Sequence, residues 1–172
     1  MLVFVHDDVY LDDWMLGVHL MEALDHFDVV GVAGNTRRQP SQLTWYLEPP
    51  VTLPDGRLSL TDWDSAHLSG AVAHGAPAQS MVKVYGPAPQ PVALLDGVFL
   101  AARAARLREA QVRFDPRFDF HFYDLDFCRT AQAAGLRLGT WPLAITHASG
   151  GQSVHSASWQ VGAQRYLEKW GQ

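Results

Sequence analysis

Three short segments of the chain combine residue types that bind metal ions or move protons. The first is His6-Asp7-Asp8, which directly follows the apolar run Leu2–Val5. Such a run is typical of a buried strand, and alternate residues of a strand share a face, so His6 and Asp8 are expected to point together, away from Asp7. Carboxylate oxygens suit a hard divalent cation such as Mg²⁺ or Mn²⁺. We therefore predict that Asp8 binds a metal ion.

The second and third segments lie in the last third of the chain. Asp124 follows three aromatic or imidazole side chains at 121–123 and opens a helical pattern. A carboxylate half sheltered by rings near a helix N-terminus can take a proton from a hydroxyl group, so Asp124 is predicted to be a general base. His147 follows the apolar run 141–145. A neutral imidazole at a strand end is a competent metal ligand, and His147 is predicted to complete the metal site with Asp8.

Each of these residues also has an ordinary structural interpretation. The acidic residues around position 8 can be solvated carboxylates before a helix, Asp124 can be an N-cap, and a single histidine at a strand end is usually structural. Three tryptophans could stack on a sugar or a base, or belong to the core or its rim: Trp45, Trp63 and Trp141. These alternatives stay open at the level of sequence.

The elements that must position these residues follow strand and helix patterns in turn. Apolar residues at helical spacing over 14–27, followed by an apolar strand over 28–34, predict a strand-helix-strand crossover and an at least partly parallel sheet. Residues 39–91 are rich in proline and glycine and predict a loop-rich insert with a hairpin around 51–60. The remaining predictions are strands at both ends of 91–102, a helix over 124–134 stopped by Gly135, a strand over 138–146 and a helix over 156–170.

Length and composition indicate one folded domain over residues 1–172. A hydrophobic content of 48% predicts a real core, and a net charge of -5 offers no basic surface, so nucleic acid is not an expected partner. The only cysteine is Cys128, which excludes an internal disulfide and a cysteine-based zinc site and favours a cytoplasmic location. No apolar run approaches the roughly 20 residues that span a bilayer, so no transmembrane segment is expected.

Taken in order, several motifs resemble the second half of family-two glycosyltransferases of the GT-A fold. The motifs are the acidic end of the first strand, Leu95-Asp96-Gly97, residues 114–118, residues 123–129 and His147. The resemblance implies an α/β fold with a mixed, mostly parallel sheet flanked by helices. It also implies that Asp8 and His147 bind the divalent cation, Mn²⁺ or Mg²⁺, and that Asp124 is the catalytic base of an inverting enzyme.

The same resemblance assigns the ligand-binding residues. It implies that His6 and Asp7 lie near the nucleotide of the donor. Asp96 and Gly97 resemble the pocket segment of the family, and Tyr123 and Trp141 are assigned to the same substrate pocket. Family members begin with a βαβ segment that holds the nucleobase and ribose, and this sequence is expected to correspond to the part after it.

The implied activity is that of a metal-dependent, inverting, hexosyltransferase-like enzyme. It would move a sugar from a nucleotide-sugar donor of the UDP type to a carbohydrate or other hydroxyl acceptor. Two alternatives stay open: a catalytically incomplete glycosyltransferase-like binding or assembly module, and a metal-dependent phosphoesterase. An uncovered sheet edge would favour a homo-oligomer.

Overall fold

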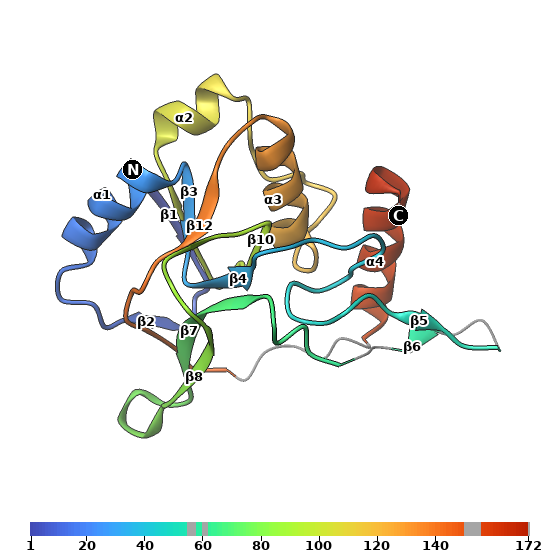
Figure 1. Cartoon of the computed structure of the whole chain (residues 1–172), viewed down its shortest axis with the longest axis horizontal. Helices are drawn as coiled ribbons and strands as arrows, with labels where there is room; N and C mark the ends of the chain where they lie inside the picture. Colours follow the sequence, from blue (N-terminus) through green and yellow to red (C-terminus); the bar gives the residue numbers. More distant parts are fainter. Residues whose placement is uncertain (55–57, 60–61, 150–155, 172) are drawn as a thin grey trace.

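The structure, a computed structural model, describes residues 1–54, 58–59, 62–149 and 156–171. In this part of the chain, two β-sheets share a core and helices cover them (Figure 1). The coarse prediction of a mixed α/β fold is confirmed. None of the helices within these ranges is both long and apolar enough to cross a membrane.

The first sheet has the strand order β1–β11–β3–β12–β9. β3 and β12 run parallel, and every other pair in this sheet is antiparallel. Within the described residues β1 pairs only with β11, and most of its side chains are exposed, so the prediction that the first strand is buried is wrong. The strands are β1 (Leu2–Val5), β3 (Val29–Gly31), β9 (Gln90–Pro91), β11 (Phe99–Ala102) and β12 (Leu138–Thr140).

The second sheet has the strand order β10–β4–β7–β13–β2, and β8 pairs with β7. Only β7 and β13 are parallel, so the prediction of a mostly parallel sheet is wrong. The crossover through α1 does orient β1 and β3 alike, but β11 lies between them in the opposite direction. The strands are β2 (Val9–Leu11), β4 (Ala33–Asn35), β7 (Leu68–His74), β8 (Met81–Gly86), β10 (Leu94–Leu95) and β13 (Ile145–His147).

Two stretches predicted as continuous strands are each divided between the two sheets. The chain leaves the first sheet at Gly31 and enters the second at Ala33, and it does so again between Thr140 and Ile145. At the second crossing the Trp141 N–H still donates to the Gly31 carbonyl at 2.9 Å, which ties the two crossings together. A continuous apolar run is expected whether its residues belong to one sheet or to two. Hydropathy therefore could not show that these stretches are divided between the sheets.

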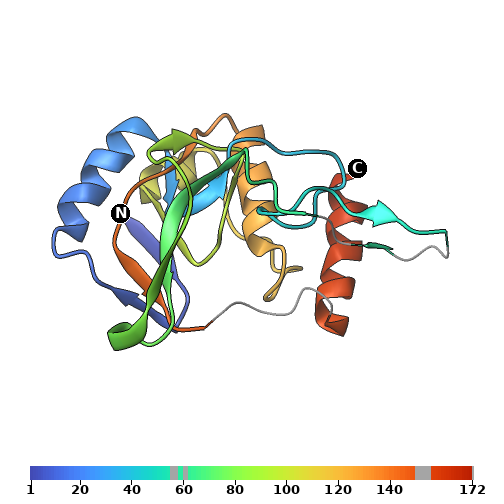
Figure 2. The ribbon, with the colours of Figure 1, turned by 60° about the horizontal axis from the view of Figure 1, so that its bottom comes forward.

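The insert over 39–91 contains a long hairpin that the sequence analysis did not predict. β7 and β8 pair antiparallel, with the short 3-10 helix η1 (Pro77–Gln79) between them, and their tip lies at the lower edge of Figure 2, in green. Gly70, with φ +96°, sits where a Cβ would overlap the Val32 carbonyl oxygen. The predicted hairpin of β5 (Val51–Thr52) and β6 (Leu58–Ser59) does form, and its turn falls outside the described residues.

Three of the four helices in the described residues agree with prediction, because periodicity and end signals specify them, whereas α2 was not predicted. α3 ends before Gly135, which has φ +76° as a left-handed helix end requires. Ser156 caps the last helix, and its Oγ accepts the Trp159 N–H at 3.1 Å. α1 and the last helix lie at opposite ends of the molecule in Figures 1 and 2. The helices are α1 (Leu16–His26), α2 (Ala104–Glu109), α3 (Tyr123–Ala133) and α4 (Ala157–Trp170).

Two buried residues of α3 hold it against its neighbours, Cys128 against β10 and Asp126 against α4. Cys128, on the buried side of α3, is fully enclosed, and its Sγ accepts the Leu95 N–H of β10 at 3.2 Å. Asp126, also fully buried, accepts a hydrogen bond from the Trp170 indole at 2.7 Å and pairs with Lys169 at the same distance. These contacts place the start of α3 against the end of β10, where the predicted catalytic residues lie.

Candidate functional site

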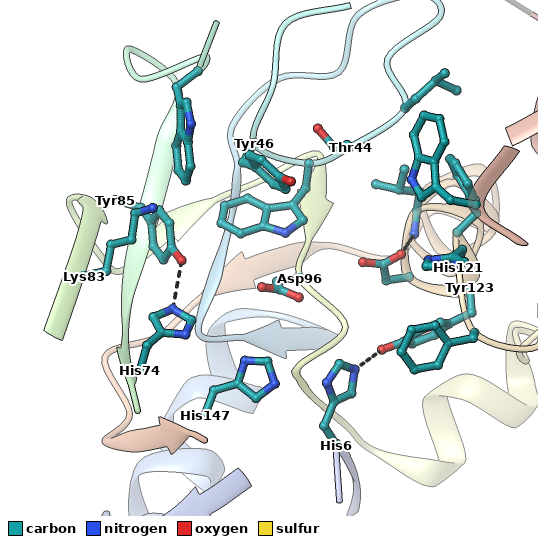
Figure 3. Close-up of a pocket in the computed structure, with 18 of the residues that line it drawn as sticks. His6, Thr44, Tyr46, His74, Lys83, Tyr85, Asp96, His121, Tyr123 and His147 are labelled. Atoms are coloured by element: carbon teal, nitrogen blue, oxygen red, sulfur yellow. Dashed lines mark hydrogen bonds between the residues drawn. The ribbon is translucent and has the colours of Figure 1, made fainter. Parts of the chain in front are cut away.

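A cavity of about 680 Å³ lies between the ends of both sheets, the start of α3 and the insert (Figure 3). Its lining includes residues that the sequence analysis selected as site residues: His6, Asp96, Tyr123, Asp124 and His147. Figure 3 shows His6 and His147 at one end of the cavity, Tyr46 and Thr44 at the other, and Asp96 between them. Segments that are far apart in the sequence therefore meet in one place.

At the polar end, three donor groups lie close enough to hold one metal ion. His6 follows β1, Asp8 lies in the turn before β2, and His147 ends β13; one ligand atom from each lies within 4.8 Å of the others. His147 Nε2 is 3.2 Å from Asp8 Oδ1. The structure thus brings together Asp8 and His147 as predicted. It adds His6, which the sequence analysis assigned to the nucleotide, as a third donor.

Backbone contacts hold this group in shape. The Val9 N–H donates to the His6 carbonyl at 3.3 Å, which closes the turn, and the Ala148 N–H donates to the Asp8 carbonyl at 2.9 Å. The turn directs His6 and Asp8 to the same side and leaves Asp7 exposed, outside the cavity. Asp7, assigned to the nucleotide from sequence, is therefore not part of the arrangement.

The protonation states at this group favour a cation. Burial lowers the pKa of His147, and the neighbouring His6 acts in the same direction, although Asp8 opposes both. Burial acts to raise the pKa of Asp8, but a hydrogen bond from Ser149 and the nearby His147 outweigh it and leave the pKa below its usual value. A neutral imidazole and an ionised carboxylate are the forms that bind metals. Two imidazoles and one carboxylate fit Mn²⁺, Zn²⁺ or Fe²⁺ better than Mg²⁺, which prefers oxygen ligands.

A pair of carboxyl groups lies beside the metal-binding group. Asp124, at the start of α3, accepts the Leu125 N–H at 2.9 Å and the Gly97 N–H at 3.2 Å on its two oxygens. Asp96, just after β10, accepts the Val98 N–H at 3.1 Å on Oδ1. Asp124 is therefore fixed in orientation, whereas the described residues give Asp96 Oδ2 no hydrogen-bond donor.

Burial raises the pKa of both carboxyl groups, and the charge of one adds to this effect at the other. Burial raises the pKa of Asp96 to about 7, and the charge of Asp124 acts in the same direction. Burial also raises the pKa of Asp124, against the N–H groups of Leu125 and Gly97, which favour the ionised form. Because the two groups interact, they titrate as a pair, and Asp96 keeps its proton to near neutral pH.

Tyr123 connects the carboxylate pair with the metal-binding group. Its Oη lies 2.7 Å from His6 Nε2, and burial raises the pKa of its phenol. This position requires a glycine at 97, because a Cβ there would lie 2.1 Å from the Tyr123 Oη. If the His6 Nε2–H donates to Tyr123, the other ring nitrogen keeps its lone pair for a metal. Gly97 thus contributes to the site in two ways: its N–H binds Asp124, and its lack of a side chain leaves room for Tyr123.

Trp141 is not brought to the cavity, which corrects its assignment to the substrate pocket. Its ring stacks on His26, with 5.4 Å between ring centroids, and lies edge-on to Phe27 at 6.5 Å. The reason is the crossing between the sheets, where the hydrogen bond to Gly31 turns this residue toward the end of α1. A tryptophan at a strand end could not be distinguished from a pocket residue by sequence alone.

Of the residues that the insert contributes to the cavity, the sequence analysis selected Trp45 and Trp63 as possible stacking residues but missed His74, Tyr46 and Lys83. His74 ends β7 directly opposite His147, with 5.7 Å between the two rings, and its Nε2 lies 3.2 Å from the Tyr85 Oη. Tyr46 and Lys83 also line the cavity. The only available signal was the position of His74 at the end of a strand, and that strand was itself unpredicted.

Comparison with known proteins gives no family for this chain. No protein-family model matches it, and no curated protein matches it. The function must therefore be argued from the cavity and from the motifs that line it.

Proposed function

We propose that the protein is a metal-dependent, inverting glycosyltransferase that moves a sugar from a nucleotide-sugar to an acceptor hydroxyl. One observation supports this best: two members of a group of metal-binding type, His6 and His147, line the same cavity as a separate carboxyl pair, and Asp8 completes that group beside the cavity. Sugar transfer with inversion needs both, because one group must face the diphosphate charge while the other takes the acceptor proton. The motifs that resemble family-two glycosyltransferases supply most of these residues.

His6, Asp8 and His147 would hold the cation. When bound, the cation would supply positive charge to the diphosphate of the donor. The residues themselves orient it: the closed turn fixes Asp8, and Ser149 Oγ lies 3.1 Å from His147 Nε2. Tyr123 positions His6 through its hydroxyl group.

Asp124 is the proposed base. Two backbone N–H groups fix its carboxylate, and each oxygen keeps a second lone pair that can accept the proton of the acceptor hydroxyl. The acceptor oxygen then bonds to the anomeric carbon while the bond to the diphosphate breaks on the opposite face. Asp96, protonated near neutral pH, can donate a hydrogen bond to another acceptor oxygen and so position it.

The test compares three variants that each remove one carboxylate charge. Nucleotide binding is measured by calorimetry with a panel of nucleoside diphosphates, with and without Mn²⁺, Mg²⁺, Zn²⁺ or Fe²⁺, and transfer is measured with the matching nucleotide-sugars. Asp8→Asn should abolish metal-dependent nucleotide binding. Asp124→Asn should keep that binding and lower transfer by about 10²–10⁴-fold. Asp7→Asn, whose side chain lies outside the cavity, should change neither.

The same measurements distinguish the alternatives. Transfer that is unchanged in Asp124→Asn would disprove the assignment of the base. Metal-dependent nucleotide binding without transfer by the wild type would favour a binding or assembly module, and the exposed β1 edge is the feature that fits such a module. Hydrolysis of a simple phosphate ester without any acceptor would favour a phosphoesterase.

A further inference from the structure

The end of the cavity away from the metal-binding group is a wall of aromatic rings from the insert. The Trp63 and Tyr85 rings are within 8° of parallel, with 6.0 Å between centroids, and Tyr46 lies 4.9 Å from Trp63. Trp45, which is only 7% exposed, packs edge-on against Tyr85 at 5.0 Å and supports the wall from the core. Trp63 is 40% exposed. Trp45 is thus a core residue, whereas Trp63 presents its ring to the cavity.

A cation and a hydrogen bond hold this wall in place. Lys83 Nζ lies 3.7 Å from the centroid of Trp63 and 5.5 Å from that of Tyr85, and in the described part of the chain no carboxylate pairs with it. An ammonium over two rings restrains both of them. The Tyr85 hydroxyl contacts His74 and thereby connects the wall to the polar end of the cavity (Figure 3). Tyr85 and Lys83, both on β8, therefore hold Trp63 from the preceding part of the insert, and these contacts exist without a ligand.

From this geometry we infer that the aromatic wall of Tyr46, Trp63 and Tyr85 is a saccharide-binding subsite that holds the ring of the acceptor. A pyranose has apolar C–H faces, which pack on aromatic rings, and an edge of hydroxyl groups, which need polar partners. The cavity offers both, because the rings of this wall and the carboxyl groups of Asp96 and Asp124 line the same space.

The polar end argues for a sugar rather than a nucleobase on this wall. A carboxylate base such as Asp124 accepts hydrogen bonds and the protonated carboxyl of Asp96 donates one, and sugar hydroxyls can both donate and accept, so a sugar edge can satisfy both groups. The role of the bound saccharide as acceptor rests on the proposed glycosyltransferase function. The binding of a saccharide to the wall does not, and the two can be tested separately.

The binding test uses the full chain without metal or nucleotide. Methyl glycosides of glucose, galactose and N-acetylglucosamine, with uridine as the aromatic comparison, are examined by saturation-transfer NMR and titration. At least one glycoside should bind more tightly than uridine. Trp63→Ala should weaken that binding at least about tenfold, the size expected for a lost stacking contact. Trp63→Phe, which keeps a ring and guards against misfolding of the alanine variant, should retain most of it.

Two further variants serve as controls. Trp14→Ala removes a tryptophan that is 101% exposed and does not line the cavity, and it should leave glycoside binding unchanged. Lys83→Met removes the cation but keeps a long side chain, and it should weaken binding a few-fold. Equal loss in Trp63→Ala and Trp14→Ala, no binding of any glycoside, or uridine binding that depends on Trp63 would each overturn the inference.

Failure of this inference and failure of the proposed function give different results. Glycoside binding that depends on Trp63, without transfer by the wild type, supports the subsite and contradicts the transferase. Transfer whose KM for the acceptor is the same in Trp63→Ala and the wild type supports the transferase and overturns the subsite.

Discussion

The carboxyl group of Asp96 differs in protonation between the folded and the unfolded protein. The folded protein raises the pKa of this carboxyl to about 7, chiefly by burial and then by the nearby Asp124. In the unfolded chain the same group ionises near its usual value of 3.8. Between these two values the folded state holds a proton that the unfolded state has released. A titrating group of this kind stabilises the folded state only at low pH.

The first prediction concerns this linkage. The contribution of Asp96 to the free energy of unfolding should fall as pH rises from about 4 to about 7, because ionising Asp96 in the cavity is less favourable than ionising it in water. Asp96→Asn, which cannot ionise, should remove that part of the fall. Urea unfolding at several pH values, for wild type and variant in parallel, checks this. Identical pH profiles for the two proteins would show that Asp96 titrates normally.

At the residue scale, the sequence predicted the site residues that lie at the ends of elements but not those whose role depends on a contact distant in sequence. Asp124 and His147 line one cavity, and Asp8 lies beside His147, because each residue lies near the end or start of an element that hydrophobic patterns detect. His6 was placed beside a ligand rather than among the metal donors, since its ring is held by a contact with Tyr123, 117 residues away. No local pattern contains that contact.

Between β10 and α3, Gly97 and Tyr123 form the contact that places both elements around the site. The second prediction is that Gly97→Ala costs about 1–3 kcal/mol, because the added methyl overlaps the Tyr123 ring and its hydroxyl. Loss of the Tyr123–His6 hydrogen bond should follow. Chemical denaturation measures the cost.

A second glycine provides the control for this substitution. Gly17 lies in α1, and a Cβ added there would meet nothing within 4 Å. Gly17→Ala should therefore leave packing intact and raise stability by up to about 1 kcal/mol through helix propensity. Effects of the same sign in both variants would contradict this account of Gly97.

The third prediction concerns how α4 is held against α3. Lys169→Met should destabilise the protein by about 3 kcal/mol, because it leaves the fully buried carboxylate of Asp126 without its cation and also breaks the pair with Asp115 at 2.8 Å. Lys83→Met is the matched control, since the Lys83 ammonium lies over aromatic rings and should cost less than about 1 kcal/mol. Denaturation midpoints compare the two, and equal losses would contradict a structural role for the Lys169 pair.

At the element scale, α1, α3 and α4 were predictable, whereas α2 and the membership of strands in each sheet were not. α3 and α4 carry their own boundaries in Gly135 and Ser156. β7 and β8 escaped prediction because Gly70 and Gly75 read as turn residues, although Gly70 is there to let the strand approach Val32. The division of strands at Val32 and Trp141 depends on which sheet each half joins, and that choice is made by partners distant in sequence.

For the whole molecule, the metal-binding group lies where the two sheets meet. His6 follows β1 of the first sheet, whereas Asp8 precedes β2 and His147 ends β13 of the second. A cation held by all three would join the sheets. The order of strand and helix patterns predicted a mixed α/β fold correctly, but strand direction, and with it this junction, depends on tertiary pairing.

The fourth prediction follows from this position. Mn²⁺ should raise the free energy of unfolding, by about 2.7 kcal/mol at a concentration a hundredfold above its Kd, because the ion binds only the folded arrangement. Thermal denaturation with and without Mn²⁺ measures the effect. Asp8→Asn should abolish it and Asp7→Asn should keep it. An equal gain in both variants would indicate binding elsewhere.

Self-association through the exposed β1 edge is a separate prediction, which light scattering can check.

The enclosed sulfur of Cys128 has a practical consequence. It is the sole thiol of the chain, and it lies between α3 and the strand that leads to Asp96. Burial also raises the pKa of this thiol, so little reactive thiolate forms while the helix is seated. A thiol-reactive dye can therefore label the protein only when α3 lifts from β10. The labelling rate therefore measures how often α3 separates from β10 beneath the cavity, and the measurement does not require a known substrate.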